Sequence, residues 1–487
     1  MSNLRRQRGF VFLVVILAVV LLLAIALAAW YLINIPDRPL DSGITNALQR
    51  HHDAVPRQDN LFFALLAFDS TNAENINQQG RAIYAGYLAH RTADAKFGVT
   101  FDNAVPVVRQ AFAGNRASLC GGRGRPEDCI ERAIAYPEDL RRLITDNRLF
   151  LDRYNGVAGY TRLQNPVQLT ENSPIASWSP FILGKRLFLT DIALQVDAGH
   201  IQQAVARLGP DIAFTRRLLA QQDILLIDKM ILAASLLDSL EMVSDLVRTQ
   251  PLSDGQYAQL STVLPPLTDG ERSLVGPLRR EFDAFAAMIG DLRNPKNARE
   301  LVSSTPSGGS VAMGGLSFHF IKYNSTLNAQ WRVLTEKIAL SRGGCTKFLS
   351  GATAFKSHAA VSLGGVLYNP IGNILSGIAA PTGIEYMHAM CDLDGMIRIV
   401  ELELQARLQH VNDEQLAQFA WNGGARYANP FTGQPMHVDV ARKTIDFEPL
   451  AQRDRFFFPW PLAAAPPGAP VQVHTMPRVP QQKTGPQ

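Results

Sequence analysis

The chain has 487 residues, of which 47% are hydrophobic and 18% charged, and its formal net charge is +4. This charge is small and dispersed along the chain, which argues against a nucleic-acid partner. A long uncharged stretch near the N-terminus instead indicates a protein that inserts into a membrane.

Residues 9–35 carry no charged side chain. They are long enough to cross a bilayer as one helix, because a span needs about 20 apolar residues. Trp30 and Tyr31 lie near the far end, where aromatic rings favour the headgroup level. Three arginines within residues 1–8 precede the stretch, so the positive-inside rule predicts a cytoplasmic N-terminus and an exported body. The sequence therefore predicts a transmembrane signal-anchor helix, with membrane lipid as the partner of residues 9–35.

A cleaved signal peptide is the alternative interpretation, since the small residues within 24–28 resemble a peptidase site. The apolar run continues through Ile33 without a polar break, which favours a retained anchor. We expect a single-pass protein of the bacterial inner membrane with a periplasmic body. In the alternative, a eukaryotic type II membrane protein, Asn324 would be a glycosylation acceptor.

Residues 36–300 are expected to form the helical exported body. Asp59 or Asn60 is expected to cap a helix at LFFALLAF, because short polar side chains satisfy the first free N–H groups of a helix. A second helix is expected to cover Glu74 to Ala95. After an irregular stretch, a further helix is expected to start at Pro137, since proline suits the first helical position.

The clearest helical signal lies in residues 180–250, where apolar residues step by three or four positions. The stripe consists of Leu226, Met230, Ala233, Leu237, Leu240, Val243 and Val247, broadened by Ile224, Ile227, Ile231 and Leu236. We therefore expect this helix to be buried on two sides, as the middle layer of a stack. Gly209-Pro210 is expected to divide the preceding segment into a hairpin.

Residues 301–390 contain four glycine pairs, which disfavour long helices. A glycine-rich loop region packed on the body is expected here, with one helix at about 317–340. The apolar piece 359–380 is not expected to be a second span, because Asn369 and Asn373 would be costly in lipid.

Residues 391–450 are expected to form a long helix followed by a small β-hairpin. The helix is expected to resume at Met396. Residues 437–440 and 444–447 alternate between apolar and polar side chains, which is typical of paired strands.

Residues 451–487 begin with an aromatic cluster at 456–460 and continue as a proline-rich tail. Two interpretations of the cluster are open: a final strand of the body, or a contact with the membrane interface. The tail has little apolar surface to bury, so we expect it to be disordered.

Four cysteines in an oxidising compartment predict up to two disulfides, with three possible pairings. The favoured pairs are Cys120–Cys129, which would close a short loop, and Cys345–Cys391, which would join two distant segments. Two free buried thiols are the alternative for the second pair. The chain has no C-x-x-C spacing, so neither a metal site nor a cofactor is predicted.

The common nucleotide-binding and hydrolase motifs are absent: the chain has no P-loop, no H-E-x-x-H and no G-x-S-x-G. Arg123 and Arg125 are candidate anion-binding residues, because the glycine amides beside them could cradle a phosphate. A solvated turn between two cysteines is the simpler interpretation of this loop.

The best candidate cluster for acid–base chemistry is Glu385, His388, Asp392 and Asp394, of which the first three are the candidate catalytic residues. Glu385 and His388 are three residues apart and Asp392 lies one further turn on, so on a helix the three share a face. A histidine beside carboxylates could act as a general base or hold a metal. In the simpler interpretation, Asp392 or Asp394 caps a helix that starts near Gly395.

Three motifs follow one another over about residues 370–450: Asn369-Pro370-Ile371-Gly372-Asn373, Asp392-Leu393-Asp394-Gly395 and Asn429-Pro430-Phe431-Thr432-Gly433-Gln434-Pro435. In their order and spacing, the chain resembles the C-terminal half of uncharacterised, membrane-anchored proteobacterial envelope proteins. The resemblance implies no activity and no catalytic residues.

The sequence thus predicts a mainly α-helical protein: one transmembrane helix, an exported multi-helix body and a small C-terminal β-hairpin. The predicted function is a non-enzymatic scaffold that binds a protein partner in the cell envelope. The alternative is a membrane-anchored periplasmic hydrolase that uses Glu385, His388 and Asp392.

Overall fold

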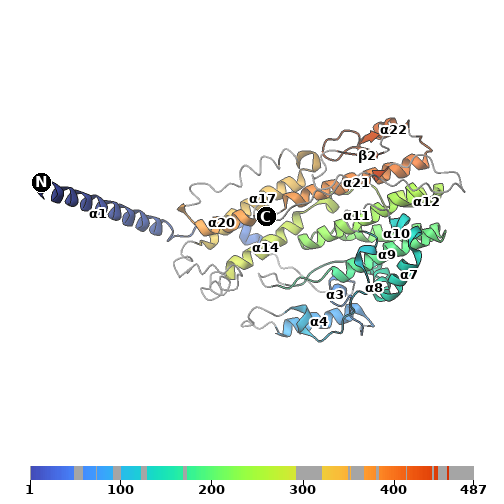
Figure 1. The fold of residues 1–487 in the computed structure, drawn as a ribbon, viewed down its shortest axis with the longest axis horizontal. Helices are drawn as coiled ribbons and strands as arrows, with labels where there is room; N and C mark the ends of the chain where they lie inside the picture. The colour runs from blue at the N-terminus through green and yellow to red at the C-terminus, as the bar shows by residue number, and fades with distance from the viewer. Residues whose placement is uncertain are drawn as a thin grey trace.

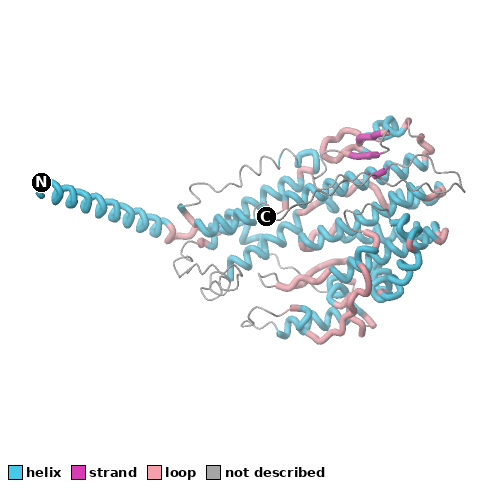
Figure 2. The backbone as a smooth tube through the Cα atoms, viewed as in Figure 1, coloured by secondary structure: helices cyan, strands magenta, loops and turns pink. Residues whose placement is uncertain are grey.

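The computed structural model describes residues 2–48, 59–72, 74–90, 100–121, 129–167, 173–291, 321–348, 351, 367–379, 383–412, 414–440, 444–447 and 458–459. In this part of the chain, helices make up most of the body and the strands gather at one end of it (Figure 2). One apolar helix, α1, projects from the other end (Figure 1). The predicted mainly α-helical fold class is therefore confirmed.

Helix α1 (Ser2–Ile33) contains the candidate membrane span Phe12–Ile33, which is 22 residues long and 0% buried. At about 1.5 Å per residue this segment is about 33 Å long, close to the thickness of a bilayer core. The helix tightens into one final turn after Ile33, and Pro36 then prevents it from continuing. It is the one candidate span within the described residues.

Short helices form the N-terminal part of the body: α2 (Ser42–Leu48), α3 (Leu61–Leu66), α4 (Ile76–His90), α5 (Phe101–Ala104), α6 (Cys129–Ala135), α7 (Pro137–Asp146) and α8 (Arg148–Asn155). Asn60 caps α3 as predicted, since its side chain accepts a hydrogen bond from the Phe62 N–H at 3.1 Å. Pro137 opens α7, also as predicted. Every residue of α3 is buried.

The longer helices follow: α9 (Ser179–Asp197), α10 (Ile201–Leu219), α11 (Leu226–Thr249), α12 (Asp254–Ser261), α13 (Asp269–Arg272), α14 (Val275–Asp291), α17 (Tyr323–Arg342), α20 (Pro370–Ala379), α21 (Ile384–Leu408) and α22 (Leu416–Asn422). Helix α11 packs against α10 on one side and α21 on another, so the predicted middle-layer helix is confirmed. Ile227 departs from the prediction, because 46% of it is exposed.

Helix α10 runs through Gly209 and Pro210, so the predicted break at this dipeptide is wrong. Proline removes one N–H donor from the helix, and that cost is local. The core side chains Leu208 and Ile212 flank the proline and are fully buried. Their burial favours a continuous helix over a hairpin.

Helix α21 begins at Ile384, not at Met396, and Gly395 lies in its interior. The expectation that Asp392 or Asp394 caps a helix start near Gly395 is therefore wrong. A Cβ atom at Gly395 would lie 2.2 Å from the Phe447 ring. The glycine is needed because this ring packs directly on the helix backbone, and it does not mark a helix end.

The predicted C-terminal hairpin is confirmed. Strand β1 (His437–Asp439) pairs antiparallel with β2 (Thr444–Asp446). A third strand, β3 (Phe458–Pro459), pairs with β2, which agrees with a final strand in the aromatic cluster. The other residues of 451–487 lie outside the described residues.

Both favoured disulfides, Cys120–Cys129 and Cys345–Cys391, are present in the structure. The first joins the segment before α6 to that helix. The second fastens the segment after α17 to α21.

Candidate functional site

The structure brings together two of the three residues predicted for acid–base chemistry. The Nδ1 atom of His388 lies 3.0 Å from Oδ2 of Asp392, and both side chains are largely buried. Glu385 lies in the first turn of α21 and is exposed. A negative charge in the first turn stabilises a helix through its dipole, so this position of Glu385 has a structural explanation without catalysis.

The His388 ring lies beside two aromatic rings, with centroids 4.9 Å from Phe431 and 6.0 Å from Phe348. Among the described residues, its hydrogen bonds go to Asp392 alone. In a catalytic triad, a carboxylate orients the histidine and the histidine also contacts a nucleophile. Within the described part of the chain, the hydrogen bonds of His388 supply the first of these contacts and not the second. Within the same residues, no group of three or more His, Cys, Asp and Glu side chains could hold a metal ion.

A second arrangement of catalytic residue types lies between α9, α10 and α11. Lys185 Nζ donates to Ser239 Oγ at 2.6 Å, and Ser239 Oγ lies 2.8 Å from Asp211 Oδ2. Lys185 also pairs with Asp211, whose other oxygen accepts from Tyr154 at 2.7 Å. Serine–lysine pairs can act as nucleophile and base. Here Lys185 is 1% exposed and Ser239 is 0% exposed, so this network holds the four helices α8 to α11 together out of reach of a substrate.

A polar stripe along α21 was not predicted from the sequence. Asp394, Arg398, Glu401 and Gln405 are spaced by four, three and four residues, which places them on one face of the helix. This spacing of polar residues by three and four positions is the signal that could have revealed the stripe. The face is turned to the interior, since Asp394 and Glu401 are both 0% exposed.

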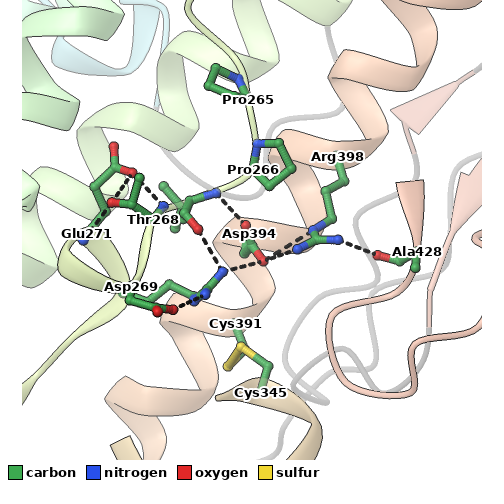
Figure 3. Close-up of polar contacts among 12 residues, drawn as sticks. Pro265, Pro266, Thr268, Asp269, Glu271, Cys345, Cys391, Asp394, Arg398 and Ala428 are labelled. Atoms are coloured by element: carbon green, nitrogen blue, oxygen red, sulfur yellow. Dashed lines mark hydrogen bonds and ion pairs between the residues drawn. A yellow bond between two sulfur atoms is a disulfide. The ribbon is translucent and has the colours of Figure 1, made fainter. Parts of the chain in front are cut away.

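Asp394 is the hub of the stripe (Figure 3). Its Oδ1 accepts from the Leu267 N–H at 2.6 Å, and its Oδ2 accepts from Arg398 at 2.9 Å and Arg272 at 3.2 Å. Arg398 in turn donates to the Ala425 carbonyl at 2.6 Å. One carboxylate therefore connects α21 to the loop before α13 and, through Arg398, to η3 (Gly424–Tyr427).

Two further buried carboxylates lie on α21. Ser261 of α12 donates to Glu401 at 3.0 Å, and Arg426 of η3 pairs with the same carboxylate. Glu403 faces α11, where Ser244 donates to its Oε2 at 3.0 Å. Burial raises the pKa of Glu403 to about 8, although Ser244 and nearby arginines oppose the shift. Glu403 is therefore a neutral acid in the core at pH 7.

The junction between α1 and the body is the other polar site. Asn34, the first residue after α1, is 0% exposed. Its amide Nδ2 donates to the Trp30 carbonyl at 2.9 Å and to the Leu367 carbonyl at 2.8 Å, while its Oδ1 accepts from the Asn369 N–H at 2.8 Å. Trp30 adds a second bond to the Leu367 carbonyl, at 2.9 Å. The end of α1 is thus bonded to a segment more than 330 residues away in the sequence.

Asn369 continues this contact into the body. Its side chain accepts from the Lys322 N–H at 2.7 Å and donates to Thr326 Oγ1 at 2.9 Å. Its φ of 55° lies in the left-handed region, which asparagine tolerates better than most residues. Gly372 allows the close approach, since a Cβ atom there would lie 2.0 Å from Thr326 Oγ1. The motif at 369–373 therefore builds the junction.

The linker after α1 also caps α17. Asp37 accepts from the backbone N–H groups of Asn324 and Ser325, at 2.8 and 3.1 Å. These are free donors of the first turn of α17, which Lys322 does not cap with its side chain. A carboxylate is favoured there by the helix dipole. The Asn324 amide donates to the Arg38 carbonyl at 2.8 Å, so this potential glycosylation acceptor is itself part of the junction.

Arg123 and Arg125, the predicted anion-binding residues, lie outside the described residues. Comparisons with protein-family models, with curated proteins and with solved structures find no match to this chain. The features of the chain that bear on its function are therefore the α21 stripe, the His388–Asp392 pair and the junction at Asn34.

Proposed function

We propose that the protein is a single-pass protein of the bacterial inner membrane, whose periplasmic body is a non-enzymatic scaffold for a protein partner. An apolar helix of spanning length follows three arginines, which supports a cytoplasmic N-terminus. Two disulfides support an oxidising compartment for the body.

The observation that carries this proposal is the unbroken course of α1 from the apolar run to the junction at Asn34. A signal peptide is removed, and the body then folds without it. Here α1 continues unbroken through residues 24–28, and its last turn is hydrogen-bonded to the body by Trp30 and Asn34. A retained anchor accounts for both features. Because Trp30 and Asn34 lie after residues 24–28, it is the apolar run that continues through Ile33 that favours retention over cleavage.

A scaffold accounts for the use of the buried polar groups. Asp394, Glu401 and Asp211 all bond groups of neighbouring elements, so they join helices to one another. Long packed helices offer broad surfaces for a partner, and anchoring raises the effective concentration of the body near other membrane proteins.

The proposal is tested on the full chain expressed in a Gram-negative host. The intact mass of the purified protein reports whether residues 1–28 remain, and extraction with alkaline carbonate reports whether the chain spans the membrane. Protease added to spheroplasts should degrade the body. A mature chain that begins within 25–29, or a body that is protected in spheroplasts and digested only after lysis, would overturn the proposal.

The hydrolase alternative has one observation in its favour, the largely buried His388–Asp392 pair. A host strain that lacks the protein can be complemented with the His388→Ala chain and, as the matched control, with Glu385→Ala. Failure of His388→Ala alone, at normal protein levels, would favour the hydrolase. Full complementation by both variants would remove it.

A further inference from the structure

The junction fixes the depth of a second segment of the chain. Both Trp30 and Asn34 donate to the carbonyl of Leu367, at 2.9 and 2.8 Å. Trp30 lies one turn before the end of the span at Ile33. If α1 crosses the bilayer, this tryptophan lies at the headgroup level. Leu367, bonded directly to it, must lie at the same level.

The side chains around this point suit a lipid interface. Leu367 is 57% exposed, Ile35 is 53% exposed and Tyr31 is 42% exposed, so apolar surface gathers where α1 meets the body. The guanidinium of Arg38 lies 5.1 Å from the centre of the Tyr368 ring and is exposed. Apolar side chains beside an amphipathic ring and a cation form the usual composition of a protein surface at the headgroup layer.

We propose that the body itself rests on the outer face of the bilayer, through Leu367, Tyr368, Ile35 and Arg38, and that Asn34 holds it there. This inference rests on the proposed function, since it requires α1 to span the membrane. The occupant of the apolar surface is lipid, because the surface is continuous with the anchor and lies at the depth that the anchor sets.

A fixed contact of this kind sets the orientation of the body. Asn34 is fully buried and bonded to Leu367 and Asn369, so the linker has no free hinge at this point. Asp37 then ties the next turn of the linker to α17. The end of the body that carries α22 and β2 lies away from α1 (Figure 1). In the membrane that end would face the periplasm, at a constant height above the bilayer.

The test uses the full chain in nanodiscs of phosphatidylethanolamine and phosphatidylglycerol. One cysteine is added and labelled with a nitroxide, while the native cysteines stay in their disulfides. The positions are Leu367→Cys, Ile35→Cys as a second probe of the contact, Leu22→Cys within α1 and Trp421→Cys at the far end, where the side chain is 64% exposed. Collision rates with oxygen, which enters lipid, and with a water-soluble nickel complex report the depth of each label.

We expect the Leu22 label to be shielded from nickel and the Trp421 label to be accessible. The labels at Leu367 and Ile35 should be at least threefold less accessible to nickel than the one at Trp421. If they equal Trp421 while Leu22 stays shielded, the lipid contact is wrong and the anchor stands. If Leu22 is also accessible, the proposed function fails with it.

The role of Asn34 is tested by adding Asn34→Ala to the Leu367→Cys chain. The nickel accessibility of the label should rise toward that of Trp421, because the body can then turn about the linker. The Leu22 label should not change. An unchanged Leu367 label would overturn the assignment of Asn34 as the residue that holds the contact.

Discussion

The junction at Asn34 and the stripe along α21 bury polar groups in two different ways. At the junction, the neutral amides Asn34 and Asn369 bond the end of α1 to the body, and the buried Lys322 places its ammonium 3.5 Å from the Ile35 carbonyl. Along α21 the buried groups are the carboxylates of Asp394 and Glu401, each paired with arginine. An amide whose donor and acceptor are both hydrogen-bonded loses little on leaving water, whereas a buried charge is costly unless several partners surround it.

The difference follows from the surroundings of each site. If α1 spans a membrane as proposed, a charge near the hydrocarbon core would be costly, and burial lowers the pKa of Lys322 at the junction. The hydrogen-bonded amides Asn34 and Asn369 avoid this cost. Asp37, the nearest carboxylate in the linker, is exposed. The α21 stripe lies inside the body, where arginines from α13, α21 and η3 can converge on the carboxylates. The charged site should therefore be the more sensitive to substitution.

The largest effect is expected from Asp394→Asn. Arg272 and Arg398 would lose their shared charged partner, and breaking a buried pair costs about 3–5 kcal/mol. The matched control is Asp152→Asn, which breaks an exposed Arg148–Asp152 pair with the same four-residue spacing and should cost less than about 1 kcal/mol. Urea unfolding of the full chain in detergent measures both. Equal losses would show that burial does not distinguish the two pairs.

The next effect is a pH dependence that Glu403→Gln should alter. The pKa of Glu403 is raised from 4.5 to about 8 in the folded chain, so the folded state keeps a proton that the unfolded state has released. The contribution of this group to stability therefore falls as pH rises from about 4.5 to about 8, by at most about 1.4 kcal/mol per pH unit. Glutamine does not titrate, so the stability of the variant relative to the native chain should increase over this window. If the difference in unfolding free energy between the variant and the native chain is the same at pH 5 and pH 8, the raised pKa of Glu403 is contradicted.

A smaller and more local effect is expected from Asn34→Ala. The Asn369 N–H loses its acceptor, a loss worth about 1–3 kcal/mol when a buried donor is left unpaired. Hydrogen exchange in residues 367–379 should accelerate while exchange in α11 stays unchanged. Asn328→Ala is the control, because its amide bonds the linker at Pro39 from a more exposed position. If both variants behave alike, Asn34 has no special role in the junction.

The smallest effect is expected from Asp37→Ala, which removes the cap of α17. Loss of a helix cap costs about 1 kcal/mol. The backbone amides of Asn324 and Ser325 should exchange faster. Asp37→Asn keeps an acceptor oxygen and should retain part of the protection, which separates the hydrogen bond from the charge. Unchanged exchange in both variants would contradict the capping role.

Local patterns in the sequence were sufficient for much of the fold. The apolar length of α1, the 3.6-residue period of α11, the Asn60 cap and the alternating hairpin all follow from neighbours within a few residues. The short separation of nine residues likewise favoured the Cys120–Cys129 disulfide. Each of these features depends on chain geometry that adjacent residues already set, whereas Cys345–Cys391 joins residues 46 positions apart.

Tertiary contacts decided what Gly395, Pro210 and Asn34 do. In the sequence Gly395 indicates a helix start, but in the structure it allows the Phe447 ring to pack on the helix backbone. Pro210 likewise indicates a break, but the burial of its neighbours Leu208 and Ile212 keeps α10 continuous. Glu385 shares a helix face with His388 in principle, yet it points to solvent in the first turn. The bond between Asn34 and Asn369 joins residues 335 positions apart. Such a contact exists only after the long helices between them have packed, and no local pattern can report it.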